Sequence, residues 1–449
     1  MRTVQELRHH IGPQVLTDPA DLARYSRDAS RAVPAGLPAA VLTARSTDDV
    51  VAGVRWAARH KVRLSVRGAG TGLAGGAVAY EGGLVMSLAG MNTIISIDPD
   101  NRLAQVQAGV VTADLDAAAA DYGLMYAPDP ASYRQSTIGG NIATNAGGLR
   151  CVKYGVTSDS VAGLEVVLAN GDVITTGART RKNVAGYDLT SLFVGSEGTL
   201  GIVTGATLRL VPRPAGKAVT FRATFPTAAS AGQAVAAIMG SFVVPDVMEL
   251  MDRASVRIVE QFHPTGLSTE GAAILVGQFI SPSSEADASV ASALCTKAGA
   301  TAVEQADGDV LLEARRVSGK ALDARGLRAS CDVAVPISRL ADMFVALEQI
   351  GAANNVEIPT FAHAGDGNLH PSVVIADESP EAYTAAERIL DLITDQAILL
   401  GGTISGEHGI GSLKVGALGK QLEPATLAAH HLIKSAFDPL GILTPGRAV

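Results

Sequence analysis

Two segments near the end of the chain combine histidine, acidic residues and glycine. The first reads His363-Ala-Gly-Asp-Gly-Asn-Leu-His370, and its central Asp366-Gly367 pair is a favoured two-residue turn of β-hairpins. With that turn, His363 and His370 face each other across the hairpin, and their Cβ atoms lie about 5 Å apart. This spacing suits two ligands of one metal ion.

The second segment, Ile404-Ser-Gly-Glu-His-Gly-Ile-Gly411, adds Glu407 and His408. A carboxylate could complete a set of two histidines and one carboxylate, which leaves coordination positions open for a substrate. Zn²⁺ or Mn²⁺ suits such a set, whereas Mg²⁺ matches two histidines poorly. The alternative is that all three histidines are hairpin or loop residues bonded to the backbone. For an arbitrary sequence that alternative is the more common case.

Three glycine-dense loops stand elsewhere in the chain, at residues 67–76, 136–148 and 195–201. Glycine lets backbone N–H groups approach a pyrophosphate closely, so together the loops favour a nucleotide cofactor over ordinary tight turns. The first loop contains the string Gly-x-Gly-x-x-Gly, which in a Rossmann fold opens a helix. Here the following residues, 82–88, read as another strand, so a Rossmann site is not expected.

The order of elements around these loops predicts a mixed fold. Helices and strands alternate up to the break at Val211-Pro-Arg-Pro-Ala-Gly216, and well-separated helices and strands follow it. We expect strands at the following ranges: 62–66, 83–88, 93–98, 103–109, 202–210, 218–224, 272–279, 331–335 and 371–376. We expect helices at the following ranges: 47–60, 113–122, 227–239, 283–298, 338–353 and 380–399.

Composition excludes several classes of protein. The formal charge of −8 and the pI near 5.6 argue against a nucleic-acid partner, which would require a clustered basic face. The start of the chain, Met1 to Gly12, has no apolar region typical of a signal peptide, and no run of about 18 uncharged apolar residues suggests a membrane span. Three cysteines, far apart, form neither a disulfide framework nor a four-cysteine iron–sulfur site. We therefore expect a cytoplasmic protein, or one held at a membrane by a partner.

The glycine loops carry a resemblance to a known family. Val66 to Gly76, Pro128 to Ser132 and Thr137 to Gly148 closely resemble the FAD-binding (PCMH-type) domain of the vanillyl-alcohol oxidase superfamily. Within it, the chain is similar to the branch of D-lactate dehydrogenase, D-2-hydroxyglutarate dehydrogenase and the flavin subunit of glycolate oxidase. The implied fold is α+β, with a two-subdomain FAD-binding domain at 1–213 and an α+β cap with an antiparallel sheet at 214–449. The last ~45 residues would return to the FAD domain.

The resemblance also implies which residues bind FAD. Thr71 stands where members with covalent flavin carry histidine, so the FAD should be non-covalent. The tail reads Thr444-Pro-Gly-Arg447 instead of the family's Asn-Pro-Gly-Lys, a departure at a flavin contact. The implied FAD-binding residues are Arg67, Gly68, Ala69, Gly70, Thr71, Gly72, Gly75, Gly76, Pro128, Ser132, Thr137, Ile138, Gly139, Gly140, Asn141, Ala143, Asn145, Gly148, Gly155, Glu197, Gly198, Gly201, Ile202 and Val203.

The family's metal motif assigns His363, His370 and Glu407 as ligands of Zn or Mn. It leaves His408 as the base that deprotonates a D-2-hydroxy acid, whose Cα hydride passes to the flavin N5. Arg315 maps to a substrate-binding arginine, and its alternative role is a solvated helix face. Ser330 replaces a lysine of members that oxidise longer diacids. Together with Pro371, it favours a small monoacid, D-lactate or glycolate.

Two other functions remain open at this stage. An FAD oxidase of alditols or phenols would share the fold and would not need the metal ligands. A non-catalytic flavin subunit of a larger complex would have lost the ligands and the base. The electron acceptor of a dehydrogenase would be a quinone, an electron-transfer flavoprotein, a cytochrome, oxygen or a separate iron–sulfur subunit.

Overall fold

A computed structural model gives the fold of the protein. It describes residues 2–30, 33–264, 266, 271, 273–308, 313–326, 328–375 and 379–449, with the backbone alone at 2, 313–316 and 380. The chain divides into two compact units. The first unit consists of residues 1–148, 154–213 and 407–449, and the second unit consists of residues 149–153 and 214–406.

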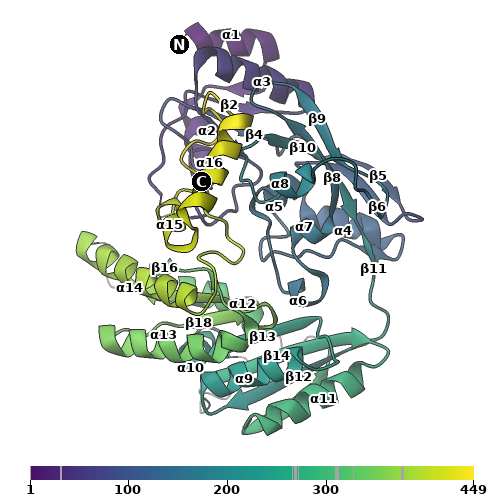
Figure 1. Cartoon of the computed structure of the whole chain (residues 1–449), viewed down its shortest axis with the longest axis vertical. Coiled ribbons are helices and arrows are strands. Elements are labelled where there is room, and N and C mark those ends of the chain that lie inside the picture. The colour runs from purple at the N-terminus through teal and green to yellow at the C-terminus, as the bar shows by residue number, and fades with distance from the viewer. Residues whose placement is uncertain are drawn as a thin grey trace. The chain divides into compact units, whose positions relative to one another are not determined.

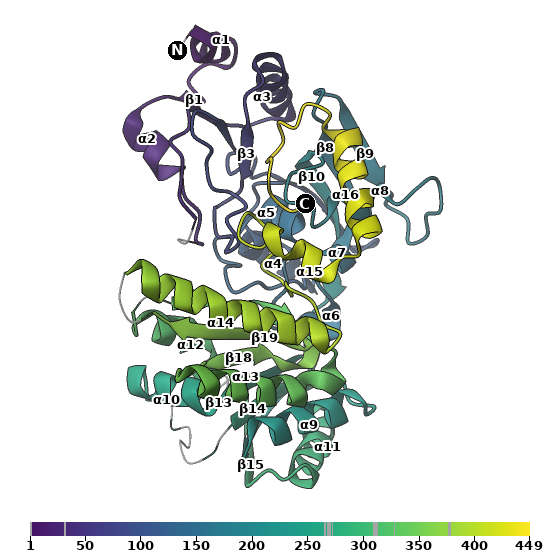
Figure 2. The ribbon, with the colours of Figure 1, turned by 60° about the vertical axis from the view of Figure 1, so that its left-hand side comes forward.

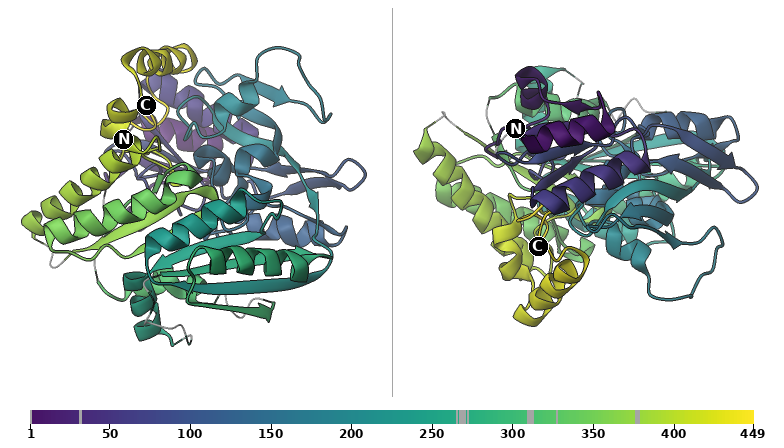
Figure 3. Two further views of the ribbon diagram at one scale, coloured as in Figure 1. Left: turned by 60° about the horizontal axis from the view of Figure 1, so that its bottom comes forward. Right: turned by 90° about the horizontal axis from the view of Figure 1, so that it is seen from above.

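The first unit begins with a four-stranded sheet of order β1-β2-β4-β3. Helix α3 packs on this sheet through its buried residues Val50, Val54 and Trp56. The helix begins after Ser46, whose side chain accepts the Asp49 N–H. Figure 3 shows α1 and α3 side by side in the view from above. The elements of this part are α1 (Arg2–Ile11), β1 (Val15–Leu16), α2 (Pro19–Arg24), β2 (Ala40–Thr43), α3 (Thr47–His60), β3 (Leu64–Arg67) and β4 (Leu84–Ser87).

A second, five-stranded sheet of order β5-β6-β10-β8-β9 completes the core of the first unit. Its buried face packs on α4, α5 and α8 through residues such as Leu115, Ile142 and Phe193. The remaining elements of the first unit are β5 (Ile94–Asp98), β6 (Leu103–Gln107), α4 (Thr112–Ala120), β7 (Leu124–Met125), α5 (Ile138–Thr144), α7 (Thr157–Ser160), β8 (Val161–Val167), β9 (Val173–Gly177), α8 (Leu189–Phe193), β10 (Ile202–Arg209), β11 (Val211–Pro212), η4 (Val415–Ala417), α15 (Leu418–Gln421) and α16 (Pro424–Phe437).

The second unit is built on an antiparallel sheet of order β15-β12-β14-β13-β18-β19-β16, with β17 paired to β19. Figure 1 shows α9 lying across β12 and β14, and Figure 2 shows α13 and α14 running side by side. Its elements are α6 (Cys151–Tyr154), β12 (Lys217–Phe225), α9 (Ala228–Met239), β13 (Val247–Asp252), α10 (Arg253–Phe262), β14 (Ala273–Ser281), α11 (Ser284–Lys297), β15 (Ala302–Asp307), α12 (Glu313–Asp323), β16 (Arg328–Ser330), β17 (Val333–Ala334), η2 (Ile337–Arg339), α13 (Leu340–Asn354), β18 (Thr360–His363), η3 (Ala364–Asp366), β19 (Asn368–Val374) and α14 (Pro380–Leu399).

The two faces of this sheet are covered differently. Leu250, Ala362 and Leu369 belong to the large core beneath α9, α11, α13 and α14. Val247, Met251 and Phe361 point to the other face and pack with α10 and α12. Strand residues alternate between faces, so every second position of β18 and β19 lies on this less covered face.

The predicted α+β class is confirmed, and each expected helix and strand has a counterpart. The sequence analysis gave no range for β1, β2, β7, β8, β9, β11, β13, β15, β16, β18, α1, α2, α5, α6, α7, α8, α10, α12, α15 and α16. Two of these, β13 and α10, follow each other directly at Asp252, so no loop composition separates them. Asp252 itself caps α10 by accepting the Ser255 N–H.

Candidate active site

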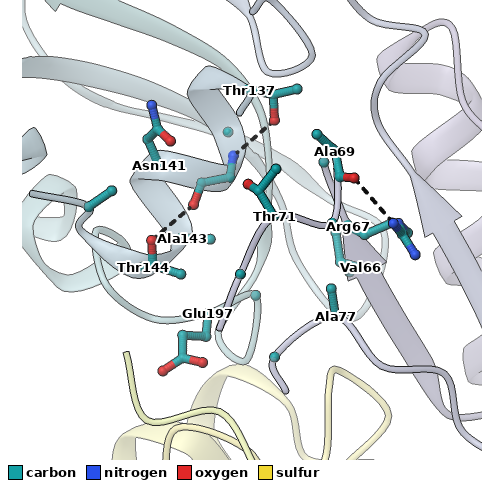
Figure 4. A pocket seen from close by; sticks show the side chains of 18 of the residues that line it. Val66, Arg67, Ala69, Thr71, Ala77, Thr137, Asn141, Ala143, Thr144 and Glu197 are labelled. Carbon is teal, nitrogen blue, oxygen red and sulfur yellow. Dashed lines mark hydrogen bonds between the residues drawn. The ribbon is translucent and has the colours of Figure 1, made fainter. Parts of the chain in front are cut away.

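A cavity of about 430 Å³ lies inside the first unit, where the three glycine loops meet. Figure 4 shows its lining, with Thr71, Thr137, Asn141 and Glu197 among the labelled side chains. The predicted FAD-binding residues that line it are Arg67, Gly68, Ala69, Gly70, Thr71, Gly72, Gly76, Ser132, Thr137, Gly139, Gly140, Asn141, Ala143, Glu197, Gly198, Gly201, Ile202 and Val203.

The loops approach each other so closely that glycine is required. A Cβ atom at position 68 would lie 2.1 Å from Thr137 Oγ1, the atom that accepts the Gly140 N–H at the start of α5. The backbone of the first loop therefore packs directly against the Thr137 side chain of the second, which fits a cofactor held by main-chain groups.

Arg67 lines the cavity but fixes the loop with its guanidinium. Nη1 donates to the carbonyl oxygens of Tyr25 and Arg27, and Nη2 donates to that of Ala69 (Figure 4). Burial lowers the pKa of this guanidinium from its ordinary value. The side chain thus fixes the first loop to the segment at Tyr25 and Arg27.

Six predicted FAD-binding residues do not line the cavity. Ile138 is fully buried in the core under the five-stranded sheet. Asn145 ends α5 in a left-handed conformation, and its side chain accepts the Ser158 N–H. Pro128 is buried, and the next residues of its motif, Pro130 and Ala131, reach the cavity instead.

The other three are glycines that serve backbone packing. A Cβ at Gly75 would meet the Ser412 Oγ at 2.5 Å, and one at Gly148 would meet the Asp129 carbonyl oxygen at 2.4 Å. A Cβ at Gly155 would meet the Asp159 carboxylate at 2.2 Å. These positions stay near the site through the loops that they allow, not through contact with the cavity.

The cavity also has apolar walls that the sequence analysis did not single out. Val66, Leu88, Ala108 and Phe193 line it from the ends of strands and from α8. Apolar walls with polar atoms at a few points are typical of cofactor pockets. Their signal in the sequence was indistinguishable from that of ordinary core residues.

Glu407 and His408 line this same cavity. The residues that follow them are fixed by Glu197, whose carboxylate accepts the N–H groups of Ile410, at 2.7 Å, and Gly411, at 2.9 Å. Burial raises the pKa of Glu197, while these two hydrogen bonds act in the opposite direction. Glu197 was predicted to contact FAD, and the structure shows that it also anchors the Glu407–His408 segment.

The C-terminal tail docks on the first unit through Arg447. This side chain is 4% exposed, and it donates to Ser65 Oγ and to the carbonyl oxygens of Gly76 and Val78. Its guanidinium lies 4.3 Å from the ring centroid of Tyr80. Arginine stands here in place of the family's lysine. Its guanidinium has five N–H donors, and it therefore can bind several carbonyl oxygens at the end of the first loop.

The two predicted histidine ligands lie together in the second unit. Their ring centroids are 5.2 Å apart, and each ring offers a nitrogen within 4.8 Å of one on the other. The predicted register was wrong, because His363 pairs with Asn368 and His370 pairs with Phe361. The turn is longer than Asp-Gly alone, since η3 precedes Gly367. The histidines are diagonal neighbours on one face, which still allows both to reach one ion.

One buried carboxylate holds His363 and a second lies beside His370, and the sequence analysis missed both. Glu249 is 0% exposed, and its Oε1 lies 2.7 Å from His363 Nδ1. An ionised carboxylate accepts the proton of Nδ1, which directs the Nε2 lone pair toward a metal ion. Asp332 is also 0% exposed, and its Oδ1 lies 3.9 Å from His370 Nδ1.

Asp332 also fixes the chain just before Glu407. Its Oδ2 accepts the Ser405 hydroxyl at 2.9 Å and the Gly406 N–H at 3.1 Å. Gly406 is the last residue of the second unit, and Glu407 follows it directly. The donor set of two imidazoles, each with a carboxylate behind it, fits Zn²⁺ or Mn²⁺. Arg315 lies in α12, and its side chain is outside the described residues.

Comparison with known proteins identifies the family. Residues 216–448 match the family described as FAD linked oxidases, C-terminal domain, and residues 38–177 match the FAD binding domain. The chain belongs to the FAD-linked oxidases. It is therefore an FAD-dependent oxidoreductase.

Individual relatives agree with this assignment. The chain is 42% identical to the glycolate oxidase subunit GlcD of Bacillus subtilis, over 99% of this chain and 96% of that protein. It is 36% identical to the D-lactate dehydrogenase of Anaerostipes hadrus, over 91% of this chain and 89% of that protein.

A solved structure of p-cresol methylhydroxylase with substrate bound shares the fold. Its TM-score is 0.83 at 19% identity, covering 100% of this chain and 96% of that one. In the part of the chain that the structure describes, no helix has the length and apolarity needed to cross a membrane.

Proposed function

We propose that this FAD-linked oxidase is a metal-assisted dehydrogenase that oxidises a small D-2-hydroxy acid, D-lactate or glycolate, to the 2-oxo acid. The observation that carries the proposal is the pair His363 and His370, each backed by a fully buried carboxylate. An alditol or phenol oxidase has no use for such a pair. The names of the two relatives, a glycolate oxidase subunit and a D-lactate dehydrogenase, support the same substrate class.

His363, His370 and Glu407 would hold the metal ion. When bound, the ion supplies a Lewis acid for the substrate's hydroxyl and carboxylate oxygens, and FAD supplies the hydride acceptor. The roles of the chain are to fix the His363 imidazole through Glu249 and to anchor Gly406, which directly precedes Glu407, through Asp332.

His408 would take the hydroxyl proton. It lines the cavity beside Glu407, and the chain beyond it is held by the Glu197 carboxylate. Imidazole has an unperturbed pKa of about 6.5, which suits proton abstraction near neutral pH. A carboxylate that binds a metal ion is a poor base, so the neighbouring histidine is the better candidate. Arg315 would be a second anchor for the substrate carboxylate.

Electrons would leave the flavin to an external acceptor. We propose a quinone, an electron-transfer flavoprotein, a cytochrome or a separate iron–sulfur subunit, because the chain's three cysteines are too few and too scattered for a cluster of its own. The word subunit in the name of the Bacillus relative supports an assembly with a partner. The protein would then be cytoplasmic, or peripheral at a membrane through that partner.

Anaerobic reduction of the flavin tests this function. The zinc-loaded protein would be mixed with D-lactate, L-lactate, glycolate or p-cresol, and bleaching of the visible flavin band would be followed. We expect bleaching by D-lactate or glycolate, and a rate lower by about 10²- to 10⁴-fold in His408→Asn. His431→Asn, on the exposed side of α16, is the matched control and should keep the rate. Reduction by p-cresol alone would contradict the proposal.

A further inference from the structure

Helix α16 is exposed along almost its whole length. The structure describes all 14 of its residues, and none of them is buried. Only Leu427, Lys434 and Phe437 are partly covered. Figure 2 shows this helix on the outside of the first unit. The outer face of α16 is therefore a surface that solvent or a partner meets directly.

The inner face of α16 fixes the orientation of the helix. Lys434 Nζ donates to the carbonyl oxygens of Thr199 and Leu443, each at 2.8 Å. The Phe437 ring packs edge-on against Phe193, with the ring centroids 5.5 Å apart. With histidine counted as neutral, Lys434 is the only charged residue of the helix. Its charge is thus directed toward the first unit, and the opposite face is held outward.

The outer face of α16 is apolar and carries no charge. Leu432 is 72% exposed, and Ile433 is 36% exposed. Positions three and four apart share one face of a helix. The residues that join these two on the outer face are all exposed, and they are Ala425, Ala428, Ala429 and Ala436. An exposed apolar face of this kind marks a surface that another molecule covers.

The order of large and small residues makes this face self-complementary. Consider two antiparallel copies of α16 related by a two-fold axis at the middle of the helix, between positions 430 and 431. Leu432 of one copy then lies over Ala429 of the other, and Ile433 lies over Ala428. Each large side chain meets an alanine. Because the face is uncharged, two identical surfaces meet without like-charge repulsion.

We infer that α16 is a dimerisation surface and that a second copy of this chain covers it. Ala425 and Ala436 meet at both ends of the pair, so the two helix axes can approach to about 8 Å. One helix pair is a small interface, so we expect a dissociation constant of roughly micromolar size. The inference is independent of the proposed function, because the outer face shares no described residue with the cavity lining.

A lipid surface is the alternative occupant of this face. Helices that lie on anionic membranes carry lysine or arginine on the polar side that borders the apolar face. The single such residue of α16, Lys434, binds the carbonyl oxygens of Thr199 and Leu443 on the inner side. A second copy therefore matches the face better than a membrane does.

Sedimentation velocity of the purified FAD-loaded protein, from about 0.1 to 100 μM, tests the inference. We expect a monomer–dimer equilibrium in the native protein. Ala429→Glu and Leu432→Lys should each raise the dissociation constant about 10- to 100-fold, because each places a charge against an apolar side chain. The double variant should recover much of the association, because the new carboxylate of one copy faces the new ammonium group of the other.

Leu399→Lys is the matched control, because Leu399 is 78% exposed at the end of α14. It should leave the dissociation constant within about twofold. The spectrum of bound flavin shows that each variant is folded.

Several results would overturn the inference. They are a native protein that stays monomeric at the highest concentration, a dimer that neither single charge weakens, equal weakening by Leu399→Lys, and a double variant no more associated than the single variants. Vesicles of phosphatidylglycerol and phosphatidylcholine test the alternative. A monomeric protein that binds them, and loses that binding in Leu432→Lys, would assign the face to a membrane and reject the dimer.

Discussion

The two histidines illustrate how buried carboxylates turn a common residue into a candidate metal ligand. Imidazole can present either nitrogen, and the partner of one nitrogen decides which lone pair faces outward. Glu249 makes that choice for His363 at 2.7 Å, from a strand 114 residues away in sequence. At the scale of single residues, the site therefore depends on groups that do not themselves touch the metal.

Replacing Glu249 by glutamine tests this dependence. Gln keeps the size of the side chain but loses its charge, so the Nδ1 proton of His363 is held less firmly. We expect zinc affinity to fall about 10- to 100-fold. Competition with a chromogenic chelator measures it directly. Glu348→Gln, on the exposed side of α13, should leave the affinity unchanged, and equal loss in both variants would contradict the role of Glu249.

The sequence predicted the histidines but not their carboxylate partners. His363, His370, Glu407 and His408 stand in short glycine-rich segments, where histidine is unusual enough to be noticed. Glu249 lies in the apolar run Val247-Met-Glu-Leu-Met-Asp252, and nothing local shows that it faces His363. Long-range strand pairing creates that contact, so only the fold reveals it.

The loops and hairpins show what glycine does for whole elements. In the β18–β19 hairpin, Gly367 adopts φ of +74°, and a Cβ there would lie 2.1 Å from the Val335 carbonyl oxygen. The 3-10 turn of η3 precedes Gly367, and the register differs by two residues from the one that a two-residue turn predicts. The Asp-Gly pair correctly predicted a hairpin but not its register. The Gly367 carbonyl oxygen also accepts the Val335 N–H, a tertiary contact that no local pattern shows.

Alanine at position 68 should disrupt the FAD site. Its Cβ would lie 2.1 Å from Thr137 Oγ1, so the first two loops would have to separate. We expect the dissociation constant of FAD to rise about tenfold or more, since overpacking of this kind costs roughly 1 to 3 kcal/mol. Fluorescence of released flavin measures it. The Gly419→Ala variant is the control, because no atom lies near that position in α15, and it should bind FAD normally. Equally weakened FAD binding in both variants would contradict the role of the contact between position 68 and Thr137.

At the scale of the whole molecule, the first unit is assembled from three separate stretches of chain. Its last stretch returns after the second unit, adds a bridge between Leu443 and Leu64, and buries Arg447 behind the first loop. The return of the tail was an expectation from family resemblance. Residues 149–153, which belong to the second unit, had no signal in the sequence, because Leu149 and the Lys153–Asp246 pair at 2.8 Å depend on tertiary packing.

Arg447→Met should destabilise the first unit and weaken FAD binding together. Methionine fills similar space but leaves Gly76 and Val78 carbonyl oxygens without their charged donor. We expect the free energy of unfolding to fall by about 2 to 4 kcal/mol. Urea denaturation followed by flavin release measures both effects. Arg181→Met, on an exposed loop, is the control, and an Arg447 variant as stable as that control would refute the anchoring role.

Metal removal tests the central claim most directly. The purified holoenzyme would be depleted of divalent metal with a chelator, checked for retained FAD, and mixed anaerobically with D-lactate or glycolate before and after addition of Zn²⁺ or Mn²⁺. We predict that depletion abolishes flavin reduction while FAD stays bound, and that one of the two ions restores the rate in the native protein but not in His363→Ala. Undiminished flavin reduction in the metal-depleted protein would contradict metal-assisted oxidation of a 2-hydroxy acid.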